Sequence, residues 1–378
     1  MVLALWYSSA GAQEKSGVEK LYDKVYNRFL GNAEDTTRKG SLLVLPALGY
    51  SPETKLTYGA QVNYAFYVDK KDKFIRPSSV YAHAVLGGNR YKYFKIDTDI
   101  WTQNNNMHYF ADIKLRDFFT RFYGTGNETK EADRDNLREN KITSLIYAEK
   151  KLAANWYAGL RAGYEKYSYT DTLAGGIFEQ ENFSDYQKGQ LIYFGLQQSH
   201  DTRNNIFSTT KGHYFTTSIS FAPSVFSGNN FTGTILKADY RHFFSLRQNL
   251  VLGLNAITNN YFSQKPVPFY FMPQMGNDEM MRGYFQGRFR DENYTVAQAE
   301  LRFRFIPRMS IAAFGGLGEV YGKVPFSFNK IKPNYGAGIR YFFDLEKSQS
   351  VRIDMGFGEK LPGEKRQKGV YFSLSEAF

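Results

Sequence analysis

The stretch that decides the fold spans residues 297–305 and reads AQAELRFRF. Every odd-numbered residue in it is apolar, and every even-numbered residue is polar or charged. Successive side chains of a β-strand point to opposite faces of the sheet. The stretch therefore predicts a strand whose apolar face carries Leu301 and Phe303. Its opposite face carries Glu300 and Arg302.

The same alternation recurs along the chain. Ile353 and Met355 alternate with Arg352 and Asp354, and residues 94–100 repeat the pattern. A soluble sandwich would bury the apolar faces of two sheets against each other. Here too many strands carry charges on the other face for a shared dry core. The pattern instead indicates a transmembrane β-barrel, with one face in lipid and the other around an aqueous interior.

The composition agrees with this fold class. The chain has 378 residues and a mean hydropathy of −0.48, and 17% of its residues are aromatic. A helical membrane span needs about 20 mostly apolar residues. The longest apolar stretches, 42–48 and 2–6, are far shorter, which argues against a multi-helix membrane protein.

Sixteen alternating segments can be counted from Ser41 onward, which predicts an all-β, antiparallel barrel of sixteen strands. The 338 residues from Ser41 to Phe378 (378 minus 40) leave about 21 per strand and connection, enough for the roughly 9–11 residues that cross a bilayer. Short connections, such as 104–106, 153–155, 247–249 and 346–349, alternate with long ones at 119–140, 171–188 and 263–293. The predicted segments begin near Ser41, Leu56, Ser78, Tyr91, Met107, Lys141, Trp156, Gly189, His213, Phe231, Leu250, Tyr294, Ser310, Asn334, Ser350 and Lys368.

Two segments precede the predicted barrel of residues 41–378. Residues 1–12 resemble an export signal, because a short apolar core is followed by Ala10-Gly11-Ala12 at a cleavage position. Residues 13–40 form a polar leader in which a short helix is expected. An even strand number places both ends of the barrel on the periplasmic side, with the leader.

The net charge and the reactive residue types argue against an enzyme. The net charge is +11, which in a barrel indicates a basic lumen or loops near anionic lipid headgroups, and we expect no nucleic-acid partner. Cysteine is absent, which excludes thiolate metal sites and cysteine nucleophiles. The five histidines show no metal-ligand spacing, and adjacent Ser199 and His200 would face opposite sides of a strand. We therefore predict no enzyme, no catalytic residue, no metal site and no cofactor.

The most informative motif lies in the connection 263–293, the sixth outer loop of this count. It reads Met281-Arg282-Gly283-Tyr284-Phe285-Gln286-Gly287-Arg288-Phe289-Arg290-Asp291. Two further segments accompany it. One is a first hairpin at 41–59 that contains Pro46. The other is a turn before the ninth strand that contains Asp201, Arg203 and Gly212. The chain also ends on a predicted strand, 368–378, whose last residue is the aromatic Phe378. Glu376 lies on the apolar face of that strand and breaks its alternation.

Together these motifs resemble the bacterial surface-antigen barrel family that includes BamA, TamA and the two-partner secretion transporters. The resemblance covers about residues 41–378 and implies that the sixth outer loop folds back into the lumen. It also implies that Arg282 pairs with a carboxylate on the inner wall. The family's acidic residue on the thirteenth strand is replaced here by Gly316. We therefore expect Glu300 as the first partner and Asp354 as the second.

The resemblance further implies a function and a location. The expected function is to assist insertion or translocation of proteins, or of lipids, through a lateral seam between the first and sixteenth strands. Pro46 removes one hydrogen-bond donor from the first strand, so this seam should pair over fewer residues than the eighth and ninth strands. The expected location is the outer membrane of a Gram-negative bacterium. The expected partners are outer-membrane lipids, client proteins or other subunits of an outer-membrane complex.

The barrel is expected to stand without the periplasmic POTRA modules of its family, which puts client capture by such modules in question. Two alternatives to this reading stay open. The chain could instead be an accessory or structural subunit of an outer-membrane complex. It could also be a passive channel, although porins lack the Arg-Gly-Tyr loop and usually constrict with their third loop.

Overall fold

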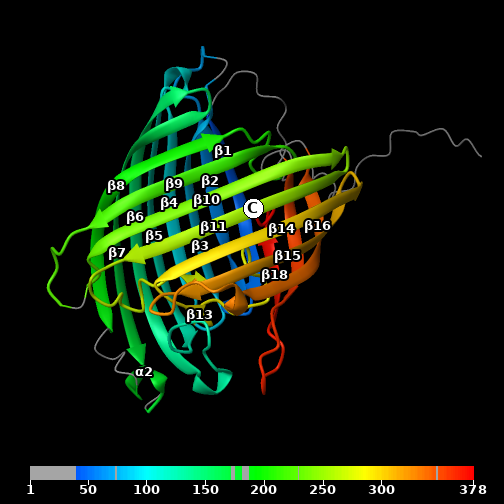
Figure 1. Cartoon of the computed structure of the whole chain (residues 1–378). Helices are drawn as coiled ribbons and strands as arrows, with labels where there is room; N and C mark the ends of the chain where they lie inside the picture. Colours follow the sequence, from blue (N-terminus) through cyan, green and yellow to red (C-terminus); the bar gives the residue numbers. More distant parts are fainter. Residues whose placement is uncertain (1–39, 73–74, 172–174, 181–186, 229, 346–347) are drawn as a thin grey trace, which may run out of the picture.

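Sixteen strands close into one antiparallel barrel, which confirms the predicted fold class (Figure 1). The structure is a computed structural model, and it describes residues 40–72, 75–171, 175–180, 187–228, 230–345 and 348–378. The predicted export signal and leader lie outside the described residues. The barrel strands are β1 Ser41–Ser51, β2 Lys55–Phe66, β3 Ser78–Gly87, β4 Lys92–Trp101, β5 Met107–Phe122, β6 Asp135–Ala153, β7 Trp156–Asp171, β8 Lys188–Asp201, β9 Gly212–Ala222, β10 Gly233–Arg247, β11 Leu250–Phe262, β14 Asn293–Ile306, β15 Met309–Tyr321, β16 Lys332–Asp344, β17 Gln349–Phe357 and β18 Lys368–Leu374.

Short elements lie in the connections. A two-stranded sheet joins β12 Gln274–Met275 to β13 Phe289–Arg290. The helices are η1 Gln103–Asn105, η2 Glu131–Asp133, α2 Ile177–Gln180 and η4 Phe328–Lys330. Among the described residues, none of the helices is long and apolar enough to cross a membrane.

The two faces of the wall carry the chemistry that the alternation predicts. Leu301 and Ile353 are 41% and 50% exposed, whereas Glu300 and Asp354 are fully buried. The apolar faces therefore turn outward and the charged faces turn inward, as expected where lipid surrounds the wall.

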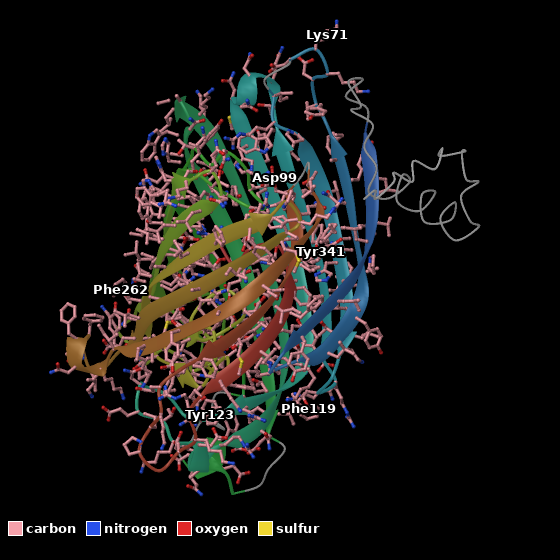
Figure 2. All side chains as sticks on the ribbon, turned by 90° about the vertical axis from the view of Figure 1, so that its right-hand side faces the viewer. Lys71, Asp99, Phe119, Tyr123, Phe262 and Tyr341 are labelled. Atoms are coloured by element: carbon pink, nitrogen blue, oxygen red, sulfur yellow. The ribbon has the colours of Figure 1, made fainter. Side chains whose placement is uncertain are left out.

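The connections differ between the two ends of the barrel (Figure 2). At the end marked by Lys71 they include tight turns at 154–155, 248–249 and 307–308, but also longer segments at 67–77 and 202–211. At the end marked by Tyr123 lie eight connections, of which 123–134 is the third (loop 3), 263–292 the sixth (loop 6) and 358–367 the eighth (loop 8).

One strand begins earlier than the sequence predicted. β6 begins at Asp135 rather than near Lys141, so the connection expected over 119–140 is reduced to 123–134. β5 and β7 continue with it, through the pairs Phe122↔Asp135 and Leu137↔Asp171. The charges of this extension hid it from the alternation pattern. Its strand pairing is stabilised because Phe122 and Leu137 are buried in an aromatic cluster with residues of loop 6.

The end of the chain also departs from prediction. The last strand was expected to run to Phe378, but β18 ends at Leu374, and Ser375 takes a positive φ of 61°. A straight continuation would turn Glu376 to the lipid, where a carboxylate is costly. The turn instead brings Glu376 to Arg340, with 3.0 Å between Oε2 and Nε. Phe378 packs against Phe243, with ring centroids 6.1 Å apart.

The two strands that close the barrel, β1 and β18, pair over few residues. β1 and β18 meet in a single register pair, Tyr50↔Phe372, whereas β8 and β9 share eight, from Phe194↔Phe221 to Asp201↔Tyr214. The expectation that the seam pairs over fewer residues is confirmed. β1 pairs along its whole length with β2 on its other side.

Candidate functional site

Loop 6 is an ordered element with a core of its own. Met275, Met281, Tyr284 and Phe289 are fully buried and form one hydrophobic cluster with wall residues of β14 and β15. The β12–β13 pairing brings the start and the end of the loop together. The apolar residues in its sequence therefore fold the loop against the wall.

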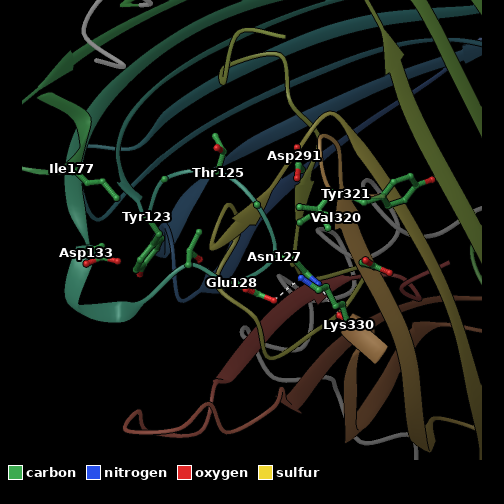
Figure 3. Close-up of a pocket in the computed structure, with 15 residues that line it drawn as sticks. Tyr123, Thr125, Asn127, Glu128, Asp133, Ile177, Asp291, Val320, Tyr321 and Lys330 are labelled. Carbon is green, nitrogen blue, oxygen red and sulfur yellow. Dashed lines mark hydrogen bonds and ion pairs between the residues drawn. The ribbon is translucent and has the colours of Figure 1, made fainter. Parts of the chain in front are cut away.

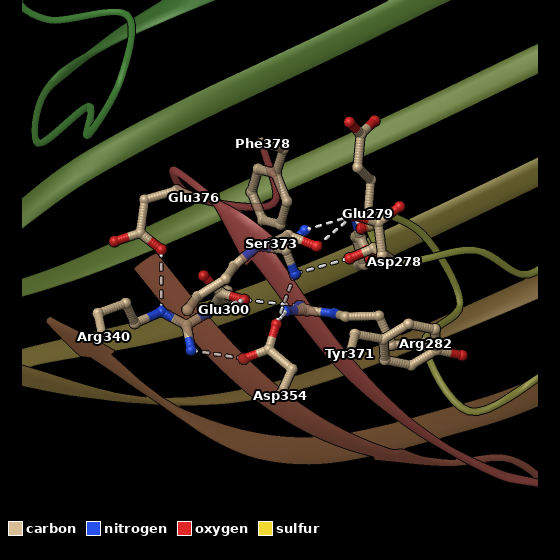
Figure 4. Close-up of polar contacts among 12 residues, drawn as sticks. Asp278, Glu279, Arg282, Glu300, Arg340, Asp354, Tyr371, Ser373, Glu376 and Phe378 are labelled. Atoms are coloured by element: carbon tan, nitrogen blue, oxygen red, sulfur yellow. Dashed lines mark hydrogen bonds and ion pairs between the residues drawn. The ribbon is translucent and has the colours of Figure 1, made fainter. Parts of the chain in front are cut away.

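Arg282 lies at the point where loop 6 meets the wall (Figure 4). Its Nη2 is 2.6 Å from Oε2 of Glu300, and its Nη1 is 2.5 Å from Oδ2 of Asp354. All three side chains are fully buried. The guanidinium also lies over Phe314, 3.4 Å from the ring centroid. Both carboxylates named from the sequence thus contact Arg282, one on each side.

The contact belongs to a larger cluster, hereafter the arginine cluster. It contains four arginines and four carboxylates, so its formal charges balance. Each guanidinium has a carboxylate oxygen within 2.8 Å. A buried ion needs such compensation, because its desolvation otherwise costs several kcal/mol. The members are Arg282, Arg302, Arg340, Arg352, Asp278, Glu300, Asp354 and Glu376.

Sequence reasoning missed part of this cluster. Arg340 and Arg352 are fully or almost fully buried, and each contacts Asp354. Arg352 was assigned the inward face of its strand, but no role followed from that parity. Glu376 broke the alternation of the last segment, which was the available signal that it leaves the lipid face.

The residues after Arg282 hold the loop to the last strands. The Gly283 N–H donates to the Tyr371 hydroxyl over 3.0 Å. Gly283 has φ 114°, and a Cβ there would come within 2.7 Å of the Phe357 backbone, so only glycine fits without a shift. The Tyr284 hydroxyl donates to the Pro333 carbonyl at 2.7 Å.

The second half of the motif binds loop 3 and loop 8 rather than the arginine cluster. Buried Arg288 contacts Glu131 of loop 3 at 3.0 Å and Glu364 of loop 8 at 2.9 Å. Gly287 supplies a positive φ of 81° before it. The Arg290 carbonyl accepts the Gly126 N–H at 2.6 Å. Loop 6 is therefore fixed at two levels, to the wall and to its neighbouring loops.

Asp291 lies away from both sets of contacts, beside a pocket of about 280 Å³ that residues of loop 3 also line (Figure 3). Burial raises the pKa of its carboxyl. Lys330 on the same pocket is already paired with Glu128, with 2.7 Å between Nζ and Oε1. That hydrogen bond lowers the pKa of Glu128.

The remaining predicted residues are distant from loop 6 or at its margin. At the turn before β9, Arg203 binds Asp201 through two hydrogen bonds of 3.0 Å, and Gly212 takes φ 101°. Pro46 lies on β1 opposite Ala60 of β2. The backbone oxygen of Phe378 accepts a hydrogen bond from Arg302 at 2.9 Å, which brings the end of the chain beside the arginine cluster.

These features define a class: an outer-membrane β-barrel with sixteen strands, a short closure and a long sixth loop bound to its wall. A profile described as the Omp85 superfamily domain matches residues 89–378. The chain belongs to the Omp85 superfamily. No curated protein sequence matches it significantly.

Solved structures show the same barrel. BamA from Haemophilus ducreyi lacking POTRA domains 1–3 superposes with a TM-score of 0.61 at 12% identity, covering 89% of this chain and 70% of that one. CdiB from Acinetobacter baumannii superposes with a TM-score of 0.57 at 13% identity, covering 90% of this chain and 65% of that one. CdiB from Escherichia coli superposes with a TM-score of 0.57 at 9% identity, covering 88% of this chain and 62% of that one. The chain thus spans about two thirds of the length of these structures, and at such identities the likeness concerns the fold alone.

Proposed function

We propose that this barrel assists insertion or translocation of proteins, or of lipids, across the outer membrane through a seam between β1 and β18. The observation that carries the proposal is the single register pair of this seam, against eight pairs between β8 and β9. A net backbone hydrogen bond contributes roughly 0.5–1.5 kcal/mol. A seam with so few bonds can separate at a cost of a few kcal/mol while the other strand pairs stay closed.

Loop 6 acts as an internal brace in this proposal. Its contacts reach the inward faces of β14 and β17 through Arg282, and β18 through Gly283. These strands lie on one side of the seam. The loop therefore occupies the lumen and keeps the C-terminal strands together when β1 moves away from them. The even strand number places both barrel ends on the same side of the membrane, and in this proposal that side is the periplasm.

A disulfide across the seam tests the proposal. Tyr50→Cys with Phe372→Cys joins the one registered pair of the seam. In cells depleted of the native protein, we expect the reduced double variant to restore the levels of other outer-membrane proteins and the oxidised one to fail. Heat-modifiable migration checks that both forms are folded.

The matched control places a disulfide between strands that are not expected to part. Leu196→Cys with Ile219→Cys joins a registered β8–β9 pair on the exposed face. This barrel should function equally well oxidised and reduced. Full function of the oxidised seam variant would contradict lateral opening and would favour a structural subunit of an outer-membrane complex.

A further inference from the structure

A second region of the interior carries charges that the arginine cluster does not neutralise. A cavity of about 450 Å³ lies between the inward faces of β5, β6, β7 and β10, and residues of loop 6, among them Tyr270 and Gln286, also line it. Five cationic side chains line it: Lys114, Arg116, Lys141, Arg161 and Lys237. Only two carboxylates do so, Asp112 and Glu165.

Two of the five cations have ionic partners. Lys114 Nζ is 2.7 Å from Asp112, and Arg116 is bound to Glu139, which does not line the cavity. For Lys141, Arg161 and Lys237, no carboxylate oxygen of the described residues lies within 4.0 Å. The one remaining carboxylate of the lining, Glu165, accepts the Tyr167 hydroxyl at 2.6 Å. Three cations thus face a single carboxylate that is not ion-paired.

The cations are held by neighbours that leave their charge uncompensated. Lys141 Nζ lies 4.6 Å from the Tyr167 ring centroid, and Lys237 Nζ lies 5.9 Å from that of Tyr261. Arg161 donates to the neutral Ser218 hydroxyl, and its buried Nε meets no acceptor among the described residues. These contacts fix the direction of the cations without neutralising them.

The strand register adds to the repulsion. Arg116 and Lys141 are directly opposite each other on β5 and β6. Like charges in that position destabilise a pair of strands. An anion placed in the cavity beside both side chains would offset the repulsion and accept hydrogen bonds from their donors.

We propose that this cavity is a binding site for a small oxyanion with two or more negative charges, such as a phosphate-bearing molecule. Ammonium groups bind phosphate oxygens as point charges, and a guanidinium binds them with a planar fork. Hydroxyls of the lining tyrosines, such as Tyr193 and Tyr261, add neutral donors. The volume is in the range of small-molecule pockets. The proposal is independent of lateral opening, since it rests on strands far from the seam.

The test is a calorimetric titration of the detergent-purified full chain with inorganic pyrophosphate, at an ionic strength held constant with sodium chloride. We expect saturable binding by the wild type. Lys237→Gln and Lys141→Gln should each weaken it at least about tenfold, which is the loss of one charged hydrogen bond. Lys237→Arg keeps the charge and should keep most of the affinity.

Lys71→Gln is the matched control, because it removes one positive charge at an exposed position far from the cavity. Its affinity should equal that of the wild type. Short-chain phosphatidic acid, titrated in parallel, separates a phosphate carried by a lipid from a free one. Wild-type protein that shows no saturable heat with either probe overturns the proposal. Equal affinities in the wild type and both glutamine variants also overturn it, and heat-modifiable migration confirms that each variant is folded.

Discussion

The arginines and lysines of the two sides of the barrel interior differ in how their charges are paired. On the side of β14 to β18, four guanidiniums meet four carboxylates, and each has an acidic oxygen within 2.8 Å. On the side of β5 to β10, Lys141, Arg161 and Lys237 have none within 4.0 Å among the described residues. The cation types differ too, since all four cations of the arginine cluster are arginines, whereas two of the three on the other side are lysines.

The difference separates a structural role from a binding role. A balanced buried cluster is sensitive to the loss of any member, because the partner left behind is an unpaired charge. It therefore suits a contact that must hold loop 6 in place. Unpaired cations destabilise the empty barrel slightly, but they leave donors free for a ligand.

The largest expected effect is on the balanced side. Arg282→Ala removes one of the two arginines that contact both Glu300 and Asp354, the other being Arg340. The buried cluster then carries one uncompensated negative charge, which should lower the free energy of unfolding by roughly 3–5 kcal/mol and loosen loop 6. Glu300→Gln should reproduce much of this loss. The measurement is the temperature at which the purified barrel loses heat-modifiable migration.

Arg247→Ala serves as its control, because Arg247 is exposed at the turn between β10 and β11. The free energy of unfolding of this variant should lie within about 0.5 kcal/mol of that of the wild type. If Arg282→Ala melted at the same temperature as Arg247→Ala, the arginine cluster would contribute nothing to the attachment of loop 6.

A smaller effect of opposite sign is expected on the unpaired side. Without added anion, Lys237→Gln removes a partly buried charge that has no ionic partner among the described residues, so the barrel should gain about 1 kcal/mol of stability. Thermal melts of the wild type and the variant, recorded in parallel without phosphate, measure this gain. A loss as large as that of Arg282→Ala would erase the distinction between the two sides.

The smallest effect concerns the outer margin of loop 6. Burial raises the pKa of Glu53, in the β1–β2 turn, and outweighs the lowering by the hydrogen bond from the Gln286 N–H. With its folded pKa above the unfolded one, the group favours folding at low pH, and stability falls as pH rises through the folded pKa. Glu53→Gln should therefore match the wild type below about pH 4.5 and melt higher than it at pH 8.

Glu128→Gln provides a comparison of opposite sign, since its ion pair with Lys330 lowers the pKa of Glu128. Ionised Glu128 therefore stabilises the folded barrel at pH 8, and this contribution to stability is lost as pH falls. The Glu128→Gln variant lacks the contribution, so it should melt no higher than the wild type at pH 8. A Glu53→Gln barrel with the same melting temperature as the wild type across this range would show that the carboxyl is not destabilised by burial.

Some features of the barrel could be predicted from the sequence because they are local. Period-2 alternation at Leu301 and Ile353 assigns the outward face without any knowledge of neighbouring strands. The same parity placed Glu300 and Asp354 inward, and counting the segments yielded sixteen strands. The extension of β6 to Asp135 escaped this reasoning, because its apolar support comes from loop 6 rather than from lipid.

Other features depend on which strands lie across the barrel from one another. The sequence by itself determined the strand number, the faces and the candidate carboxylates for Arg282. Only the tertiary structure decided that Arg282 lies between Glu300 and Asp354, which are 18 and 72 residues away. It also decided that Glu376 turns inward to Arg340, and that cations from β5, β6, β7 and β10 share one cavity. The physical reason is that charge compensation acts across a few ångströms of space, and the closure of the barrel sets those distances.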